Sequence, residues 1–224
     1  MKILVGGCSF SETRLNFNQK SWTDILSEEY DVTNLAKSHY GQSKICLSII
    51  EELIKGKFNY DLVLIQLSAF GRGFAIDEKD FVERILKDNL LEFAPYIHEY
   101  SKNGLESGYI TNDTTKISNE FVKYSLLLIY MLMFILDSKK INYKMFYGWR
   151  QIDGDIINSN QELVNSIHSS DNFWIYKNYG GMMEYIKDTA GQSGIDEDDF
   201  HLNELGNELF YKKIKKILKE KSVL

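Results

Sequence analysis

Two short segments near opposite ends of the chain carry the residue types that nucleophilic catalysis needs. Near the start, Gly6-Gly7-Cys8-Ser9 follows an apolar run at positions 2–5. A serine in a glycine-rich turn after a strand is presented with backbone N–H groups around it, which suits both a nucleophile and an oxyanion hole. The turn also fits a plain loop or a phosphate-binding loop, although it lacks the lysine and the glycine spacing of nucleotide sites. On this segment alone, a plain turn is the preferred interpretation.

Near the end of the chain, Asp198 stands three residues before His201, ahead of the last predicted helix. An acid at this spacing in a turn can place its carboxylate against the imidazole Nδ1, which leaves Nε2 available as a general base. The alternative is a solvated acidic run over residues 196–199 with a histidine that flanks a helix. Ser9 favours the first interpretation, because it completes the chain order Ser, Asp, His.

The segments between these two sites alternate between strand and helix patterns. Short aliphatic or β-branched runs, typical of buried strands, occur at 2–5, 30–35, 61–67, 143–147 and, more weakly, 173–176. Helical spacing of apolar residues predicts helices at 22–26, 43–53, 117–136 and 203–219. This alternation predicts an α/β fold with a parallel sheet of about five strands and right-handed crossovers. In such a sheet functional loops follow the carboxyl ends of the strands, as the loop of Ser9 does.

The length and composition predict a single domain over residues 1–224. The irregular segment at about 71–116 is too long for an ordinary connection, so we interpret it as an insertion near the site, with a lid as one option. The uncharged apolar run from Tyr124 to Leu136 is shorter than the roughly 18 residues that a membrane-spanning helix needs. We therefore expect a buried helix there and no membrane partner.

The charge balance and the cysteines exclude several function classes. With 26 Lys and Arg against 32 Asp and Glu, the net charge is −6, which does not favour binding to nucleic acid. The two cysteines, Cys8 and Cys46, are too few for a disulfide framework and lack zinc-ligand spacing. Reduced thiols and the lack of an apolar segment long enough for a signal peptide lead us to expect a cytoplasmic protein, with bacteria and phages among the compatible sources. The oligomeric state is left open.

Together, the two terminal segments resemble the SGNH, or GDSL-like, hydrolases. In that family the nucleophile lies in a Gly-Asp-Ser turn after the first strand and an Asp-x-x-His motif lies near the C-terminus. The counterparts here are Gly7-Cys8-Ser9 and Asp198-Asp199-Phe200-His201. The resemblance implies a three-layer α/β/α, flavodoxin-like fold in which Ser9 is the nucleophile, His201 the base and Asp198 the residue that orients the base. It also implies that no metal or organic cofactor is required.

Of the other two motifs of the family, one has a counterpart in this sequence and the other has none. A glycine whose N–H donates to the oxyanion follows the second strand, and Gly41 fits that position. The third motif, Gly-x-Asn-Asp, has no counterpart, because the third strand runs into Gln66-Leu67-Ser68-Ala69-Phe70-Gly71-Arg72 without an asparagine. The chain resembles a divergent branch with Gly-Cys-Ser-Phe in the first motif, in which Ser68 or Arg72 replaces the missing donor. Without a replacement, the loss of one donor costs on the order of 10²- to 10³-fold in rate.

Three further side chains have alternative roles. Arg72 can clamp an anionic group of the substrate, or it can pair with an acid such as Glu12 and brace the loop. Cys8 is a second candidate nucleophile, but neighbouring residues on an extended turn point to opposite sides, so we expect Cys8 to be buried. Trp149 follows the fourth predicted strand, where its ring would lie at the mouth of the site and could stack on a sugar.

These residues predict a serine esterase that removes small acyl groups. Carbohydrate esters are the expected substrates, by analogy with the family. One alternative is an acyltransferase that uses the same triad and admits a sugar hydroxyl in place of water. Another is a non-catalytic SGNH-like binding or structural module, which the missing asparagine favours and the retention of Ser9, Asp198 and His201 disfavours.

Overall fold

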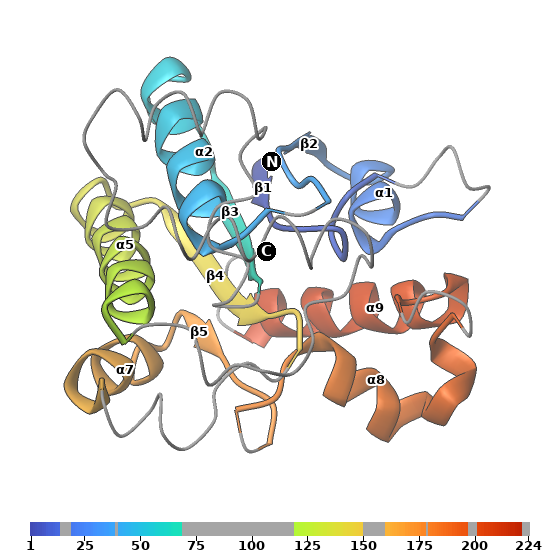
Figure 1. The fold of residues 1–224 in the computed structure, drawn as a ribbon. Coiled ribbons are helices and arrows are strands. Elements are labelled where there is room, and N and C mark those ends of the chain that lie inside the picture. Colours follow the sequence, from blue (N-terminus) through green and yellow to red (C-terminus); the bar gives the residue numbers. More distant parts are fainter. Residues whose placement is uncertain are drawn as a thin grey trace, which may run out of the picture.

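The computed structural model describes residues 1–13, 19–38, 40–68, 119–149, 160–177, 179–196 and 201–220. Within these residues strands and helices alternate along the chain (Figure 1). The strands are β1 (Lys2–Gly6), β2 (Asp31–Asn34), β3 (Leu62–Leu67), β4 (Asn142–Tyr147) and β5 (Phe173–Trp174). The helices are α1 (Trp22–Ser27), α2 (Gln42–Lys55), α5 (Asn119–Ser138), α7 (Gln161–His168), α8 (Met182–Ala190), the 3-10 turn η4 (Gly191–Gly194) and α9 (Glu204–Glu220). The predicted insertion at 71–116 lies outside the described residues.

The strands form one sheet in the order β2-β1-β3-β4-β5, and every pairing is parallel. All six residues of the central strand β3 are buried, because an apolar strand with helices on both faces has no solvent side. The register pairs Val5 of β1 with Asn34 of β2 and with Leu64 of β3, so the loops that follow these strands leave the same edge of the sheet. The predicted α/β fold with a five-stranded parallel sheet is confirmed, and its strand order is the flavodoxin-like one.

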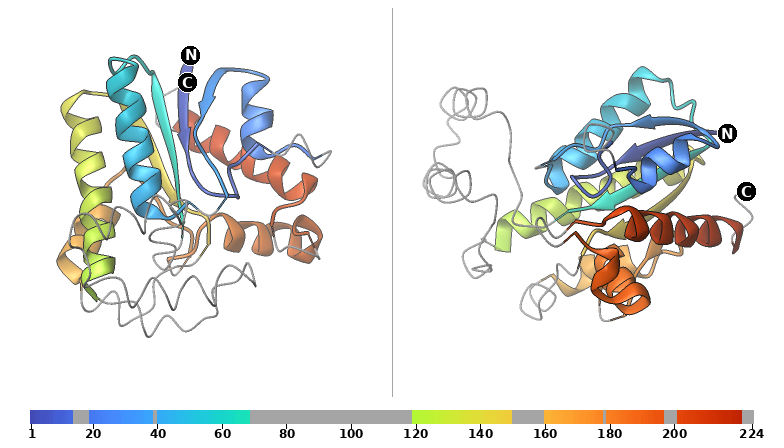
Figure 2. Two further views of the ribbon diagram at one scale, coloured as in Figure 1. Left: turned by 45° about the horizontal axis from the view of Figure 1, so that its top comes forward. Right: turned by 90° about the vertical axis from the view of Figure 1, so that its right-hand side faces the viewer.

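Two layers of helices cover the two faces of the sheet (Figures 1 and 2). α2, α5 and α7 pack on one face, and α1, α8 and α9 pack on the other. The alternation of side chains along β3 supplies both layers, since Val63 and Ile65 join the first hydrophobic cluster while Leu62 and Leu64 join the second. The arrangement is the expected three-layer α/β/α fold.

The helices differ in how clearly the sequence marks them. α1 begins with a capping box, in which the Asp24 N–H donates to Ser21 Oγ at 3.2 Å and the Ser21 N–H donates to Asp24 Oδ2 at 2.8 Å. α7 and α8 were not predicted, because each spans only a few turns and mixes apolar with polar residues. α8 starts next to Gly181, where a Cβ would lie 2.0 Å from the backbone oxygen of Tyr147, so only glycine allows this close approach to β4.

α5 differs from the expectation of a buried helix. Its inner side packs into the core through Leu126, Ile129 and Leu132, but the helix lies in the outer layer and can bury only one face. The outward positions between residues 124 and 134 are all aromatic or aliphatic, and we call them the α5 stripe: Tyr124, Leu127, Tyr130, Met131 and Phe134. No helix within the described ranges is both long enough and apolar enough to cross a membrane.

Candidate active site

Ser9 and His201 meet where the chain leaves β1. After β1 ends at Gly6, the chain turns tightly, and the Ser11 N–H donates to the Cys8 carbonyl oxygen at 2.9 Å. His201 lies shortly before α9, and its Nε2 is 2.8 Å from Ser9 Oγ although the two residues are 192 positions apart in the chain. A serine hydroxyl within hydrogen-bond reach of an imidazole has the geometry that activation by a general base requires.

The loop that presents His201 is closed at its base by two contacts. The Asp196 N–H donates to the His201 carbonyl oxygen at 2.7 Å, and Ile195 forms an antiparallel bridge with Leu202. These contacts hold the two ends of the loop together and fix where His201 leaves it. Asp198, the expected orienting acid, belongs to this loop but lies outside the described residues, so its role remains a prediction.

Gln66 of β3 braces the turn that carries the nucleophile. Its side chain is fully buried, and its Oε1 accepts hydrogen bonds from the Cys8 N–H at 3.0 Å and from the Ser11 hydroxyl at 3.2 Å. Its Nε2 donates to the Leu67 carbonyl oxygen at 2.7 Å, which fixes the orientation of the amide. Gly148 makes room for this amide, because a Cβ there would lie 2.5 Å from Gln66 Nε2.

Both cysteines are buried. Cys8 Sγ lies 3.4 Å from Gln66 Oε1, which agrees with the expectation that this side chain points into the protein. Burial raises the pKa of Cys46 to about 12, so that this thiol stays protonated at neutral pH.

Side chains from α1 and β2 hold the same turn at its far end. The Trp22 Nε1–H donates to the Phe10 carbonyl oxygen at 3.1 Å. The Ser11 carbonyl oxygen accepts from the Thr23 hydroxyl at 3.0 Å and from Asn34 Nδ2 at 2.8 Å. The backbone on both sides of Ser9 is therefore fixed by buried or partly buried hydrogen bonds, which pre-organise the position of the Ser9 hydroxyl.

Asn207 of α9 connects the serine turn to the histidine loop. Its Oδ1 accepts from the Trp22 N–H at 3.0 Å, and its Nδ2 donates to the Leu202 carbonyl oxygen at 2.9 Å. Because Trp22 braces the turn after Ser9 and Leu202 follows His201, one buried amide couples the two loops. This coupling sets the distance between the two candidate catalytic groups.

The ring of Phe10 packs between the imidazole of His201 and the ring of Trp149. The ring centroid of Phe10 lies 4.6 Å from that of His201 and 4.9 Å from that of Trp149. The structure thus brings Trp149 next to the site through Phe10, as its position after β4 predicts. Whether Trp149 contacts a substrate remains a prediction.

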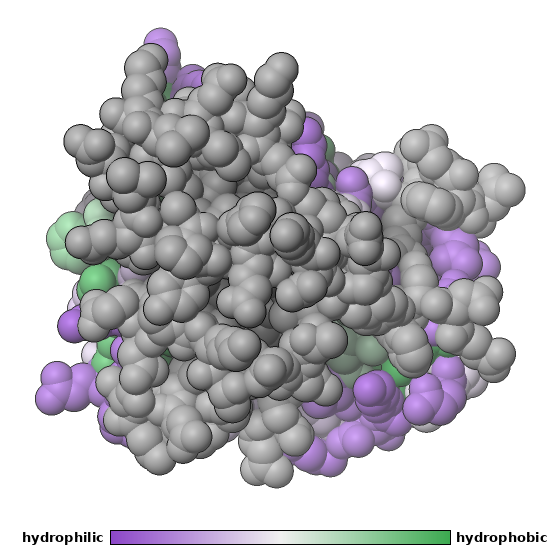
Figure 3. All heavy atoms as spheres, viewed as in Figure 1, coloured by the Kyte–Doolittle hydropathy of each residue, from purple (hydrophilic) through white to green (hydrophobic). Residues whose placement is uncertain are grey.

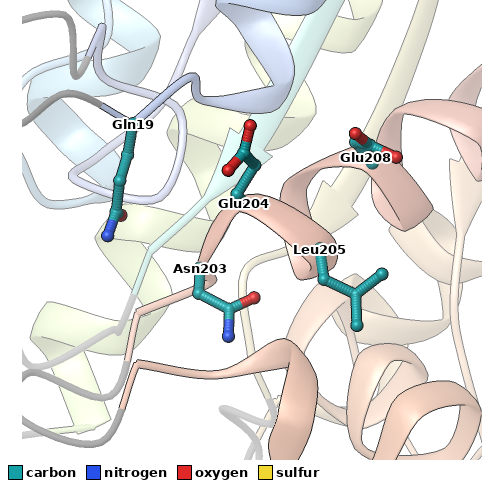
Figure 4. Close-up of a pocket in the computed structure, with 5 residues that line it drawn as sticks. All are labelled: Gln19, Asn203, Glu204, Leu205 and Glu208. Carbon is teal, nitrogen blue, oxygen red and sulfur yellow. The ribbon is translucent and has the colours of Figure 1, made fainter.

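Two hollows lie around the start of α9. The smaller is too narrow to hold a water molecule and is lined by Ser9, Phe10, Ser21, His201, Leu202 and Asn207. The larger has a volume of about 470 Å³ and is lined by Gln19, Asn203, Glu204, Leu205 and Glu208 (Figure 4). In Figure 4 Gln19 faces the start of α9, from which the other four side chains project. The larger hollow is lined mainly by residues that follow His201 closely in the chain, and the candidate reacting groups line the smaller one.

The start of α2 offers donors for an oxyanion. Gly41 caps α2, and its N–H has no hydrogen-bond acceptor within the described part of the chain. The buried Gln42 side chain accepts from the Ser68 N–H at 3.0 Å and donates to the Ser68 carbonyl oxygen, so the end of β3 is held against the start of α2. The buried Ser68 hydroxyl has no partner among the residues that the structure describes. Arg72 lies outside those residues.

The sequence identified both members of the central contact, but not the side chains that position them. Gln66, Gln42 and Asn207 had no assigned role, because each acts through partners distant in the chain. The only signal for Gln66 was an amide in an otherwise apolar strand. No group of three or more His, Cys, Asp or Glu side chains that could hold a metal ion occurs within the described ranges.

Comparisons with known proteins identify the fold. The esterase EstA from Pseudoalteromonas sp. is similar with a TM-score of 0.54 and 14% identity over 98% of this chain and 97% of that one. TesA is similar with a TM-score of 0.55 and 14% identity over 100% of both chains. A catalytic mutant of Axe2, an acetylxylan esterase from Geobacillus stearothermophilus, has a TM-score of 0.52 and 12% identity over 97% of this chain and 93% of that one. No protein-family model matches the chain, and no curated protein matches it in sequence. The chain therefore shares its fold with these proteins, two of which are esterases.

Proposed function

We propose that this chain is a serine esterase in which Ser9 is the nucleophile and His201 the general base. The observation that carries the proposal is the 2.8 Å contact between Ser9 Oγ and His201 Nε2, formed within a fold shared with esterases. Asp198 would orient the imidazole by accepting from Nδ1–H and would stabilise the imidazolium that forms during the reaction. The hydrogen bond from the Asp196 N–H to the His201 carbonyl oxygen, which holds the two ends of this segment together, supports the proposal.

The reaction would proceed through an acyl-enzyme. Ser9 Oγ bonds to the acyl carbon while its proton passes to His201 Nε2, and the ester C–O bond breaks as His201 returns the proton to the leaving alcohol. A water molecule then loses a proton to His201 Nε2 and attacks the acyl carbon. The bond from this carbon to Ser9 Oγ breaks as His201 gives the proton to Oγ, which releases the carboxylic acid and restores the serine. The buried braces on the turn limit the movement of Ser9 between these steps.

The negative charge on the acyl oxygen needs donors at fixed positions. The N–H groups of Ser9 and Gly41 would supply two of them, and the N-terminal end of α2 adds a favourable dipole. We assign the third to the Ser68 hydroxyl, which has no other partner within the described part of the chain and is held against α2 by Gln42. Arg72 is the alternative third donor.

The features near the pair favour an ester of a hydroxylated alcohol, and the small acyl group, such as acetyl, is part of the same proposal. The hollow of about 470 Å³ carries the amide of Gln19 and the carboxylate of Glu204, groups that can bind sugar hydroxyls. Trp149 adds a ring on which a sugar can stack. One of the proteins of similar fold is an acetylxylan esterase.

Turnover of p-nitrophenyl acetate and of acetylated xylose by variants tests this function. Ser9→Ala and His201→Ala should each lower kcat/KM by at least about 10³-fold, because the two residues act as one unit. Asp198→Asn should also lower kcat strongly. Cys8→Ala is the matched control, a neighbouring small residue whose loss should leave most of the activity. Full activity of folded Ser9→Ala, or loss of activity only in Cys8→Ala, would overturn the assignment.

A further inference from the structure

The outer face of α5 is the most unusual surface among the described residues. Every outward position of the α5 stripe is large and apolar, and Met131 and Phe134 are 54% and 68% exposed. In Figure 3 some green spheres are visible at the left edge of the molecule, where α5 lies in Figure 1. α9 is a useful contrast, because most of its exposed positions are charged, among them Glu208, Lys212 and Lys216. A contiguous exposed apolar stripe of this kind marks an interaction site.

The spacing of the exposed positions on α5 indicates which partner fits. They are Lys123, Tyr124, Leu127, Tyr130, Met131, Phe134, Asp137 and Ser138. If two α5 helices lie antiparallel and cross between residues 130 and 131, position 124 lies opposite 137, 127 opposite 134, and 130 opposite 131. Each exposed position then faces another exposed position. A two-fold interface needs a surface that is complementary to itself in this sense. Four of the five positions of the stripe, 127, 130, 131 and 134, map onto one another in this way, and Tyr124 falls opposite the exposed Asp137.

We propose that the α5 stripe is a homodimer interface, in which two copies of this chain pack their α5 helices antiparallel about a two-fold axis near Tyr130 and Met131. Leu127 would then lie against Phe134 of the partner subunit. Lys123, at one end of the stripe, would approach Asp137 of the partner subunit, so that opposite charges meet at both ends. Like charges would meet only if the helices packed in parallel.

The exposed area of the stripe is sufficient for a specific dimer of moderate affinity. If a fully exposed large side chain offers about 200 Å², the exposed fractions of the stripe correspond to about 500 Å². α2 packs beside α5, and if the interface includes its exposed Leu47 and Ile54, the estimate rises to about 700 Å² per copy. A standard interface buries about 800 Å² per partner. We expect dimerisation at micromolar concentration.

A membrane surface fits the stripe less well. Helices that lie on membranes usually carry several basic residues along the border of their apolar face. Between Tyr124 and Leu136 α5 has no basic residue, and the chain as a whole is acidic with a net charge of −6. Packing against a second copy of this chain does not require basic residues beside the apolar face.

Sedimentation velocity over a range of protein concentrations tests the interface. We expect a reversible monomer–dimer equilibrium for the native chain and a monomer for the Met131→Glu/Phe134→Glu variant. Leu205→Glu is the matched control, an exposed apolar residue on α9, and should still dimerise. Circular dichroism should show that all variants are folded. A native chain that is monomeric throughout, including one that binds acidic lipid vesicles instead, would overturn the proposal.

Cysteine cross-linking tests the antiparallel packing itself. A Leu127→Cys/Phe134→Cys variant should form intermolecular disulfides on mild oxidation, because position 127 faces position 134 across the axis. Leu127→Cys alone should not, since the two copies of position 127 would lie about 10 Å apart along the helix axes. The native Cys8 and Cys46 are buried and do not interfere. Efficient cross-linking of the single variant would mean parallel packing and would contradict the proposal. Neither measurement depends on esterase activity, so the interface and the proposed function can fail separately.

Discussion

On the face of the sheet covered by α1, α8 and α9, the buried polar side chains form a connected hydrogen-bond network. On the face covered by α2, α5 and α7, several buried hydroxyl groups have no hydrogen-bond partner among the described residues. Asn207, Trp22 and Gln66 on the first face each make two or more hydrogen bonds. On the second face, the hydroxyls of Ser43 and Ser125 are buried without a partner among the described residues. The two faces bury similar apolar residues, so the core alone does not explain this difference.

The difference follows from what each face must hold in place. Ser9 and His201 come from opposite ends of the chain, and a displacement of about 1 Å between them would cost catalytic rate. A directional network fixes such a distance better than apolar contacts do, because hydrogen bonds constrain angles as well as separation. Neither Ser9 nor His201 packs among the described residues of the other face, where the proposed donors Gly41 and Ser68 lie only at the start of α2, and its outer helix carries the α5 stripe.

Ser68 lies at the boundary between the two faces and should give the largest effect. Ser68→Ala should lower kcat by about 10²- to 10³-fold with little change in KM, because one oxyanion donor is lost. The thermal stability should not fall, since the hydroxyl makes no hydrogen bond within the described part of the chain. Steady-state kinetics and a melting curve measure both quantities.

Ser125→Ala is the control for that experiment. It removes an equally buried and unpartnered hydroxyl from α5, and it should leave kcat unchanged. If Ser68→Ala kept full activity, the third donor would have to be another group, with Arg72 as the first candidate.

Removing the brace on the nucleophile turn should have a smaller effect on rate and a clear effect on stability. Gln66→Leu leaves the buried Cys8 N–H and the Ser11 hydroxyl without their acceptor, which should lower the free energy of unfolding by about 2–4 kcal/mol. We expect kcat to fall about 10- to 100-fold as Ser9 loses its fixed position. Urea unfolding and kinetics at a temperature where the variant is folded check both numbers.

Leu53→Ala supplies the comparison on the opposite face. It should cost a similar 2–5 kcal/mol through an apolar cavity, yet leave kcat close to that of the native chain. Equal losses of kcat in the two variants would show that lower stability, rather than the loss of positioning, slows the reaction.

His168 should give the smallest effect, on the pH dependence of stability. Burial lowers the pKa of His168 to about 4, whereas the unfolded chain has its ordinary value near 6.5. Between these pH values the unfolded state binds a proton that the folded state does not, so stability should fall as the pH drops from 6.5 towards 4. The loss should be about 2 kcal/mol, since solvent screening of the partly exposed ring reduces the full effect.

His168→Phe tests this dependence. The variant keeps a ring beside Tyr147 and Phe173 but cannot titrate, so its melting temperature should change less between pH 6.5 and 4.5 than that of the native chain. Identical pH profiles for the two proteins would mean that other groups govern the acid response.

The sequence predicts the fold and the central contact, because both depend on local patterns. Aliphatic runs mark the strands, and the motifs around Ser9 and His201 are short and lie next to strand or helix ends. The braces are different, since Gln66 meets Cys8 across 58 residues and Asn207 meets Trp22 across 185. Which amide meets which backbone group depends on sheet order and register, and these emerge only in three dimensions. The exposed side of α5 was missed for a related reason: an apolar run does not reveal that only one of its faces is covered.

The most direct test of the account is labelling with a fluorophosphonate probe, read by intact mass and peptide mapping. The native chain should take up a single adduct on Ser9, because only an activated serine reacts readily with this electrophile. Folded His201→Ala should take up little or none, and Cys8→Ala should label like the native chain. A folded native chain without an adduct, or with its adduct on another residue, would contradict the claim that Ser9 and His201 form a catalytic pair.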